Sequence, residues 1–311
     1  MNPAETPGEN LARLETESRN PRTRELDRLP TAALVEALHA ENYAVAEAVQ
    51  AILPQVAQVV DLLAERMERG GRLFYIGAGT SGRLGVLDAS ECPPTFGVAP
   101  GLVQGIIAGG ETALTSSIEG AEDSPETGAR DLEARGVTAN DVVVGIAASG
   151  RTPYVIGALD AARQVGAVTV AVVNVSDSAL SRHADITLAA ITGPEALTGS
   201  TRLKAGTAQK MILNLLTTAA MVRLGKVYGN LMVDLRATNS KLRDRAARIV
   251  MAAAEVDRAA AEAALAQADW HAKTAIVMLR LGISAAEAAR RLHAACGWVR
   301  AAIEEDKPSP P

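Results

Sequence analysis

The sequence predicts an α/β protein, a three-layer sandwich with a five-stranded parallel sheet, followed by a small C-terminal helical bundle. Short apolar runs recur through the middle of the chain, and helical stretches separate them. Near-continuous apolar strands that alternate with helices are typical of a parallel sheet covered on both faces. The five predicted strands are residues 72–77, 102–108, 141–147, 167–174 and 185–190.

Helical patterns flank these strands and continue after them. Apolar residues recur at helical spacing from about residue 31 to 67, with a break near Pro54. A loop of small residues precedes a long helix that ends near Leu224, and no strand pattern follows Ser240. We therefore divide the chain into an N-terminal arm (1–30), an α/β domain with its N-terminal helices (31–240), and a C-terminal helical subdomain with a short tail (241–311).

Composition excludes several classes of protein. The 311 residues are 48% hydrophobic and 22% charged, which is ordinary for a soluble globular protein. A net charge of -5 gives no positive field for a nucleic-acid backbone, so we expect no nucleic-acid partner. Two distant cysteines, no signal-peptide core and no run of about 18 apolar residues lead us to expect a cytoplasmic protein without membrane contact.

Two similar turns follow the first and third predicted strands. Residues 77–83 and 145–151 both fit the pattern G-x-x-x-S-G-R, each before a helix. Such a turn offers backbone N–H groups, a hydroxyl and the positive end of a helix, which together suit a phosphate. The alternative is that small residues only pack a tight turn there. The candidate binding residues are Thr80, Ser81, Gly82, Ser149, Gly150 and Thr152.

The first turn also fits the dinucleotide pattern G-x-G-x-x-G. That pattern requires an acidic residue about 20 positions later, at the end of the second strand. Position 102 is leucine, and Glu111 comes too late. The sequence therefore argues against a nicotinamide or flavin enzyme.

Two carboxylates are candidates for catalysis. Glu91, in DASECPPT, is expected at a rigid turn, because Pro93 and Pro94 should end the preceding helix. Glu122 lies in an acid-rich loop before the Ser124-Pro125 helix start. Two carboxylates near a phosphate site would supply an acid and a base for chemistry on a sugar, although solvated surface acids are the alternative. The four histidines have no metal-ligand spacing, so we expect no metal.

Four segments, residues 72–97, 107–124, 141–159 and 197–234, resemble the N-acetylmuramic acid 6-phosphate etherases of the sugar isomerase (SIS) domain superfamily. The resemblance covers nearly the whole chain. It implies a cytoplasmic lyase without cofactor or metal that splits the lactyl ether of N-acetylmuramic acid 6-phosphate, giving N-acetylglucosamine 6-phosphate and D-lactate in cell-wall recycling. It further implies that Glu91 is the proton donor, that Glu122 is the second catalytic carboxylate, and that the protein is a homodimer with sites near its two-fold interface.

Two other functions remain open at this point. Glucokinase regulatory protein also resembles this family, so the chain could be a regulator that binds a sugar phosphate without converting it. A ketose-aldose isomerase of the same superfamily is the third possibility.

Overall fold

The computed structural model describes residues 15–235, 237 and 239–304. They form two compact units: residues 15–90 with 101–217, and residues 91–100 with 218–304. Two of the three boundaries fall within helices, α5 (Gly79–Phe96) and α9 (Lys204–Arg223), and the third falls between Pro100 and Gly101. Our division at residues 30 and 240 stays a prediction, and residues 1–14 of the predicted arm lie outside the described residues.

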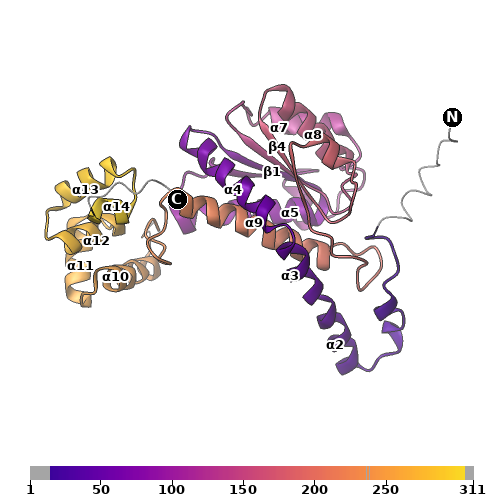
Figure 1. The fold of residues 1–311 in the computed structure, drawn as a ribbon, viewed down its shortest axis with the longest axis horizontal. Coiled ribbons are helices and arrows are strands. Elements are labelled where there is room, and N and C mark those ends of the chain that lie inside the picture. Colours follow the sequence, from indigo (N-terminus) through magenta and orange to yellow (C-terminus); the bar gives the residue numbers. More distant parts are fainter. Residues whose placement is uncertain (1–14, 236, 238, 305–311) are drawn as a thin grey trace. The chain divides into compact units, whose positions relative to one another are not determined.

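The first unit contains a five-stranded parallel sheet in the order β2-β1-β3-β4-β5, which confirms the predicted fold class (Figure 1). All residues of β1 and β3 are buried, which explains their unbroken apolar character. Gly77 at the end of β1 is in register with Ile146 at the end of β3. The strands are β1 (Leu73–Gly77), β2 (Val103–Ile107), β3 (Val142–Ile146), β4 (Val168–Val173) and β5 (Ile186–Ala189).

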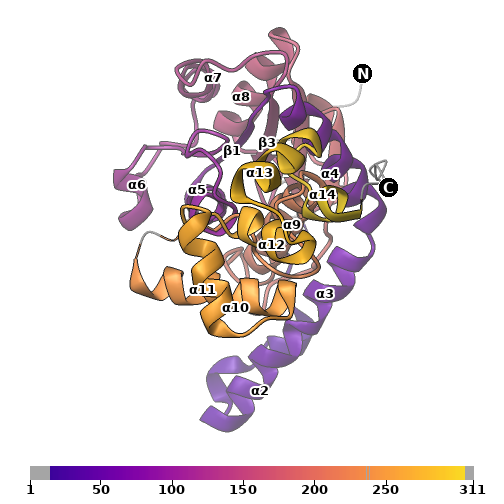
Figure 2. The same ribbon diagram turned by 90° about the vertical axis from the view of Figure 1, so that its left-hand side faces the viewer.

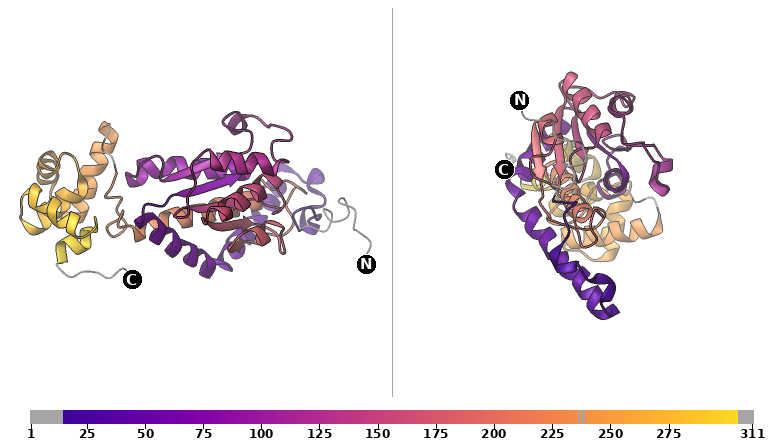
Figure 3. Two further views of the ribbon diagram at one scale, coloured as in Figure 1. Left: turned by 90° about the horizontal axis from the view of Figure 1, so that it is seen from above. Right: turned by 90° about the vertical axis from the view of Figure 1, so that its right-hand side faces the viewer.

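Helices cover both faces of the sheet, so the unit has three layers (Figures 1 and 3). Helices α7 (Pro125–Glu133) and α8 (Pro153–Gln164) cover one face, where Phe74 and Val143 share a buried core with Tyr154. On the other face, α5 and α9 lie against β1: the Tyr75 side chain contacts Gly85, and its hydroxyl donates to the Leu213 carbonyl at 3.4 Å. Helix α4 (Leu53–Glu68) packs on β5.

The described part of the predicted N-terminal arm is held to the first unit by buried hydrogen bonds. It forms two short turns of 3₁₀-helix, η1 (Pro21–Thr23) and η2 (Leu26–Arg28), before α2 (Thr31–Glu41) and α3 (Tyr43–Gln50). Asn20 donates to the Glu41 carboxylate at 2.7 Å, and the Thr23 hydroxyl donates to the Ala196 carbonyl at 2.8 Å. The Glu41 carboxylate also pairs with the buried Lys204 ammonium at 2.7 Å.

Helix α5 corrects our expectation for the ECPP segment. The helix does not end before Pro93; it continues through both prolines to Phe96. A proline removes one helical N–H bond, yet the buried side chains of Cys92 and Phe96 fix this last turn by packing. Gly97 then ends the helix in the left-handed conformation, and its N–H donates to the Pro93 carbonyl at 3.0 Å. Glu91 is therefore an exposed residue of a helix rather than of a turn.

The second unit contains the predicted C-terminal helices, which gather into one group (Figure 2). Their alanine-rich inner faces, with Ile249, Leu265 and Ile276, form a small core. Among the described helices, none is long and apolar enough to cross a membrane. The helices are α10 (Ser240–Ala254), α11 (Arg258–Gln267), α12 (Ala272–Leu281), α13 (Ala285–Ala294) and α14 (Val299–Glu304).

Candidate active site

The two S-G-R turns begin at neighbouring strand ends. Because β1 and β3 pair in parallel, the turn after Gly77 and the turn after Ile146 start side by side at the carboxyl edge of the sheet. The strand order reverses between β1 and β3, and open α/β sheets bind ligands at such a point. The fold thus brings together the two turns that the sequence singled out.

The first turn opens helix α5 and has the features of an anion site. Gly79, Thr80 and Ser81 lie in its first turn, where backbone N–H groups have no acceptor within the helix. Gly79 has a φ of 51°, and a Cβ added there would have no atom within 4 Å, so the space above it is open. Gly82 is buried and serves packing, since a Cβ there would lie 2.6 Å from the Gly77 carbonyl oxygen.

The start of helix α9 lies next to this turn but is already capped. A Cβ on Gly206 would be 3.3 Å from the Thr80 side chain. The fully buried Glu195 carboxylate accepts the N–H groups of Lys204 and Ala205, both at 2.9 Å. A protein carboxylate thus satisfies this helix N-terminus, and the start of α5 is the better place for a ligand phosphate.

The second turn, residues 147–152, is fixed by backbone bonds. Gly150 has a φ of 60°, and a Cβ there would lie 2.3 Å from the Ser178 Cβ, so only glycine fits. The Gly150 carbonyl accepts the Leu180 N–H at 2.8 Å. Ser149 and Thr152 are half-buried, and Thr152 is the N-cap residue of α8 without a side-chain capping bond, so its hydroxyl is not used for the helix.

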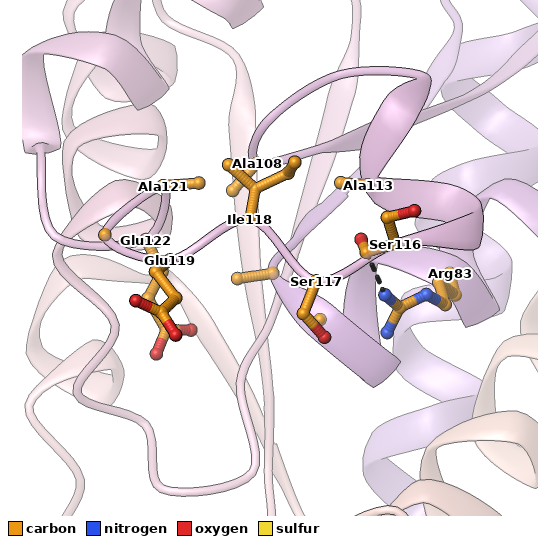
Figure 4. A pocket seen from close by; sticks show the side chains of 12 residues that line it. Arg83, Ala108, Ala113, Ser116, Ser117, Ile118, Glu119, Ala121 and Glu122 are labelled. Atoms are coloured by element: carbon orange, nitrogen blue, oxygen red, sulfur yellow. Dashed lines mark hydrogen bonds between the residues drawn. The ribbon is translucent and has the colours of Figure 1, made fainter.

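Glu122 lies beside both turns. Its side chain lines a cavity of about 210 Å³ together with Gly79 and Arg83 of the first turn. Its backbone carbonyl accepts the N–H of Tyr154, in the first turn of α8, at 3.0 Å. Figure 4 shows the carboxylates of Glu119 and Glu122 pointing the same way from this loop. The structure therefore holds the Glu122 loop between the starts of α5 and α8.

Arg83, the arginine of the first turn, has a structural partner. Its guanidinium donates to the Leu114 carbonyl at 3.1 Å and to the Ser116 carbonyl at 3.4 Å (Figure 4). These bonds tie helix α5 to α6 (Thr112–Thr115) and to Ser116 directly after it, which leads into the Glu122 loop. Arg83 thus helps to position that loop.

Glu91 is at the opposite end of α5 from the first turn. Along one helix the 12-residue separation from Gly79 corresponds to roughly 18 Å. Glu91 is exposed and belongs to the second compact unit. The structure does not group it with the residues of the first turn.

Two buried residues near the first turn, Gln209 and Asn174, are not among the candidates that the sequence predicts. The Ser81 hydroxyl bonds to Gln209 on α9, and Gln209 bonds to Asn174 at the end of β4. The two contacts join residues that are 128 and 35 positions apart in sequence, so no local spacing predicts either of them. The one local signal is that Asn174 follows a strand, as binding residues of parallel sheets often do.

Comparison with known families defines the class of protein. Residues 55–163 match the glucokinase regulatory protein N-terminal SIS domain, residues 122–219 match the SIS domain, and residues 229–277 match the C-terminal lid domain of glucokinase regulatory protein. In structure the chain is similar to a phosphoheptose isomerase from Francisella tularensis, with a TM-score of 0.48 and 16% identity over 62% of this chain and 100% of that one. By its family matches, the chain is a SIS-domain protein.

Full-length relatives define the family. The chain is 58% identical to the N-acetylmuramic acid 6-phosphate etherase of Mycolicibacterium smegmatis, over 94% of this chain and 98% of the relative. It is 57% identical to the enzyme of the same name from Yersinia pestis, over 94% of this chain and 99% of the relative. The chain belongs to the N-acetylmuramic acid 6-phosphate etherase family, as the sequence motifs implied.

Proposed function

We propose that the protein is a lyase that cleaves the D-lactyl ether of N-acetylmuramic acid 6-phosphate, yielding N-acetylglucosamine 6-phosphate and D-lactate. Membership of the etherase family supports this activity. The observation that carries it is the position of Glu122, which lines one cavity together with Gly79 at the open start of α5. A sugar with its phosphate at that helix start would lie within reach of this carboxylate.

The proposed reaction follows from the acidity of the substrate. Opening of the sugar ring exposes an aldehyde at C1, so the C2 proton becomes removable. Glu122 removes it, the C3–O bond to lactate breaks, a C2–C3 double bond forms, and Glu91 protonates the departing lactate oxygen. Water then adds its oxygen to C3 and a proton returns to C2. The N–H groups of the α5 start and the hydroxyls of Thr80, Ser149 and Thr152 hold the phosphate.

The distance along α5 between Gly79 and Glu91 limits how Glu91 can act on a sugar whose phosphate is bound at Gly79. A hexose phosphate bound at Gly79 does not extend roughly 18 Å along the helix, the distance to Glu91. We infer a homodimer in which Glu91 of a second copy meets the Glu122 of the first. Large apolar side chains that are exposed in the first unit, among them Val35, Tyr43 and Leu87, are available to such a second copy.

The location of the protein in the cell and the two alternative functions are part of the same proposal. We propose a cytoplasmic enzyme of amino-sugar recycling, because its substrate class is phosphorylated and phosphosugars form inside cells. A sugar-phosphate regulator or an isomerase is less supported, since the full-length relatives bear the etherase name.

The direct test is to incubate the purified protein with N-acetylmuramic acid 6-phosphate and to assay D-lactate. An etherase releases D-lactate in proportion to the sugar consumed. Unphosphorylated N-acetylmuramic acid should barely react, because the phosphate site is then empty. Binding without turnover would instead identify a regulator, and a new sugar without lactate would identify an isomerase.

A further inference from the structure

A chain of buried side-chain hydrogen bonds links the two S-G-R turns. The Ser81 Oγ lies 2.8 Å from Gln209 Oε1, Gln209 Nε2 lies 3.0 Å from Asn174 Oδ1, and Asn174 Nδ2 lies 2.9 Å from the Ala190 carbonyl oxygen. The Asn174 backbone N–H donates to the carbonyl of Ala148, in the second turn, at 3.0 Å. Ser81, Asn174 and Gln209 are 8%, 0% and 1% exposed.

We call the hydrogen-bonded chain from Ser81 through Gln209 and Asn174 to the Ala190 carbonyl the relay. The Ala190 carbonyl, at its end, determines the direction of every bond in it. A backbone carbonyl can only accept, so the Asn174 amide must present its NH₂ to Ala190 and its oxygen to Gln209. Gln209 must then present its NH₂ to Asn174 and its oxygen to Ser81. The only partner that satisfies a buried carbonyl oxygen is a donor, so the Ser81 hydroxyl gives its single proton to Gln209.

This order fixes what Ser81 can do for a ligand. With its proton used by Gln209, the Ser81 oxygen retains only lone pairs and can only accept a hydrogen bond. We propose that Gln209 is a positioning residue of the sugar-phosphate site: through this relay it holds Ser81 as an acceptor for an O–H group of the bound sugar phosphate. The inference rests on the proposed function and deepens it, because it assigns anion binding in the first turn to the backbone N–H groups rather than to the Ser81 proton.

A Gln209→Glu substitution tests the relay through pH. A neutral glutamic acid reproduces the whole pattern, since its carbonyl accepts from Ser81 and its O–H donates to Asn174. An ionised carboxylate has no proton for Asn174 and repels its oxygen. Position 209 is 1% exposed, so burial should raise the pKa of the introduced carboxyl above its ordinary value of about 4.3. We expect the KM of this variant for N-acetylmuramic acid 6-phosphate to match wild type below that pKa and to rise roughly ten-fold or more as the carboxyl ionises. The ratio of variant to wild-type KM removes the titration of the substrate itself.

A double-mutant cycle gives the second readout. Gln209→Met, which neither donates nor accepts in the relay, should raise KM roughly ten-fold at every pH, with a smaller effect on kcat. In a Ser81→Ala background the same substitution should change KM by less than about two-fold, because Gln209 acts through Ser81. Gln55→Met on the exposed surface of α4 is the matched control and should behave as wild type.

Two results would overturn the proposal: a pH-independent KM ratio for Gln209→Glu, or equal effects of Gln209→Met with and without the Ser81 hydroxyl. If Gln209 acted only in folding, its substitution would lower the melting temperature. The KM ratio would then not depend on pH, and the effect of Gln209→Met on KM would not depend on the Ser81 hydroxyl. If the wild type releases no D-lactate, the proposed function fails instead, and the same variants are then compared by calorimetric binding of N-acetylglucosamine 6-phosphate.

Discussion

At the residue scale, two neighbouring carboxylates of one loop have different surroundings. Glu119 and Glu122 both line the cavity beside the first turn. Only Glu122 has its backbone tied to α8, through the Tyr154 N–H at 3.0 Å. Its carboxylate is thus carried by a fixed segment of the loop, which a catalytic base requires. The pair provides a catalytic candidate and a matched control of the same charge.

Glu122→Gln should lower the rate of D-lactate release on the order of 10²–10⁴-fold, because an amide cannot remove the C2 proton. Glu119→Gln should retain most of the activity, since it removes the same charge from the same cavity. Circular dichroism of both variants should match wild type, because both side chains are exposed. Equal losses in the two variants would show that the cavity needs negative charge rather than a base at position 122.

The residues of this site also show which of its features the sequence can predict and which it cannot. The sequence predicts both turns because their residues are contiguous and follow strands, and it predicts the Glu122 loop from its acidic run before the Ser124-Pro125 helix start. Gln209 was missed because its partner Ser81 is 128 positions away in sequence, and only the packing of α9 against α5 brings them together. A local pattern contains no information about such a pair.

At the element scale, the second turn depends on one glycine. Alanine at Gly150 would suffer both the left-handed backbone and a clash with Ser178. Alanine at Gly136, with a φ of 63° and no neighbour within 4 Å, would suffer the backbone strain alone, roughly 1–2 kcal/mol. Gly150→Ala should therefore reduce the free energy of unfolding by a further ~1–3 kcal/mol. Denaturant unfolding of the two variants measures the difference, and equal losses would contradict the packing argument.

A buried ion pair joins α2 to α9. Burial alone would raise the pKa of Glu41, but hydrogen bonds from Arg22, Lys204 and Asn20 outweigh it and lower the pKa from 4.5 to about 2. A folded-state pKa below the unfolded one stabilises the protein above pH 4.5, and this stabilisation is lost as the pH falls toward 2. The shift corresponds to about 3 kcal/mol at neutral pH.

Glu41→Gln should therefore be less stable than wild type by about 3 kcal/mol at pH 7, because an amide gains nothing from ionisation and leaves the Lys204 charge unpaired. The difference should narrow steadily below about pH 4.5, because Glu41 takes up its proton there in the unfolded wild type, while in the folded protein it stays ionised until the pH nears 2. Urea unfolding across this range measures it. A difference that stays constant down to pH 3 would contradict the assigned pKa.

Helix α5 shows why element boundaries are harder to predict than strands. Strands β1 and β3 are buried on both faces, so their apolar character alone identifies them. The end of α5 depends instead on whether packing of Cys92 and Phe96 outweighs the bonds lost at two prolines. That balance is tertiary, and local rules for proline gave the wrong end.

At the scale of the whole molecule, the dimer proposal has a decisive test by complementation. If each site combines Glu122 of one copy with Glu91 of the other, the two inactive variants Glu91→Gln and Glu122→Gln should restore activity when co-folded. Random pairing makes half of the dimers mixed, and each mixed dimer has one intact site of two, so about a quarter of wild-type activity should return. The two variants carry different affinity tags, so that mixed dimers can be isolated by sequential capture. No recovery in these mixed dimers would mean that each site uses both carboxylates of one chain.

Isotope labelling during turnover shows whether elimination cleaves the C3–O bond of the lactyl ether. The protein is incubated with N-acetylmuramic acid 6-phosphate in ¹⁸O-labelled water, and both products are analysed by mass spectrometry. If elimination occurs, ¹⁸O appears at C3 of N-acetylglucosamine 6-phosphate and D-lactate remains unlabelled. A parallel reaction in deuterated water then places deuterium at C2. Label in the lactate hydroxyl would mean that the other C–O bond breaks, which contradicts the elimination.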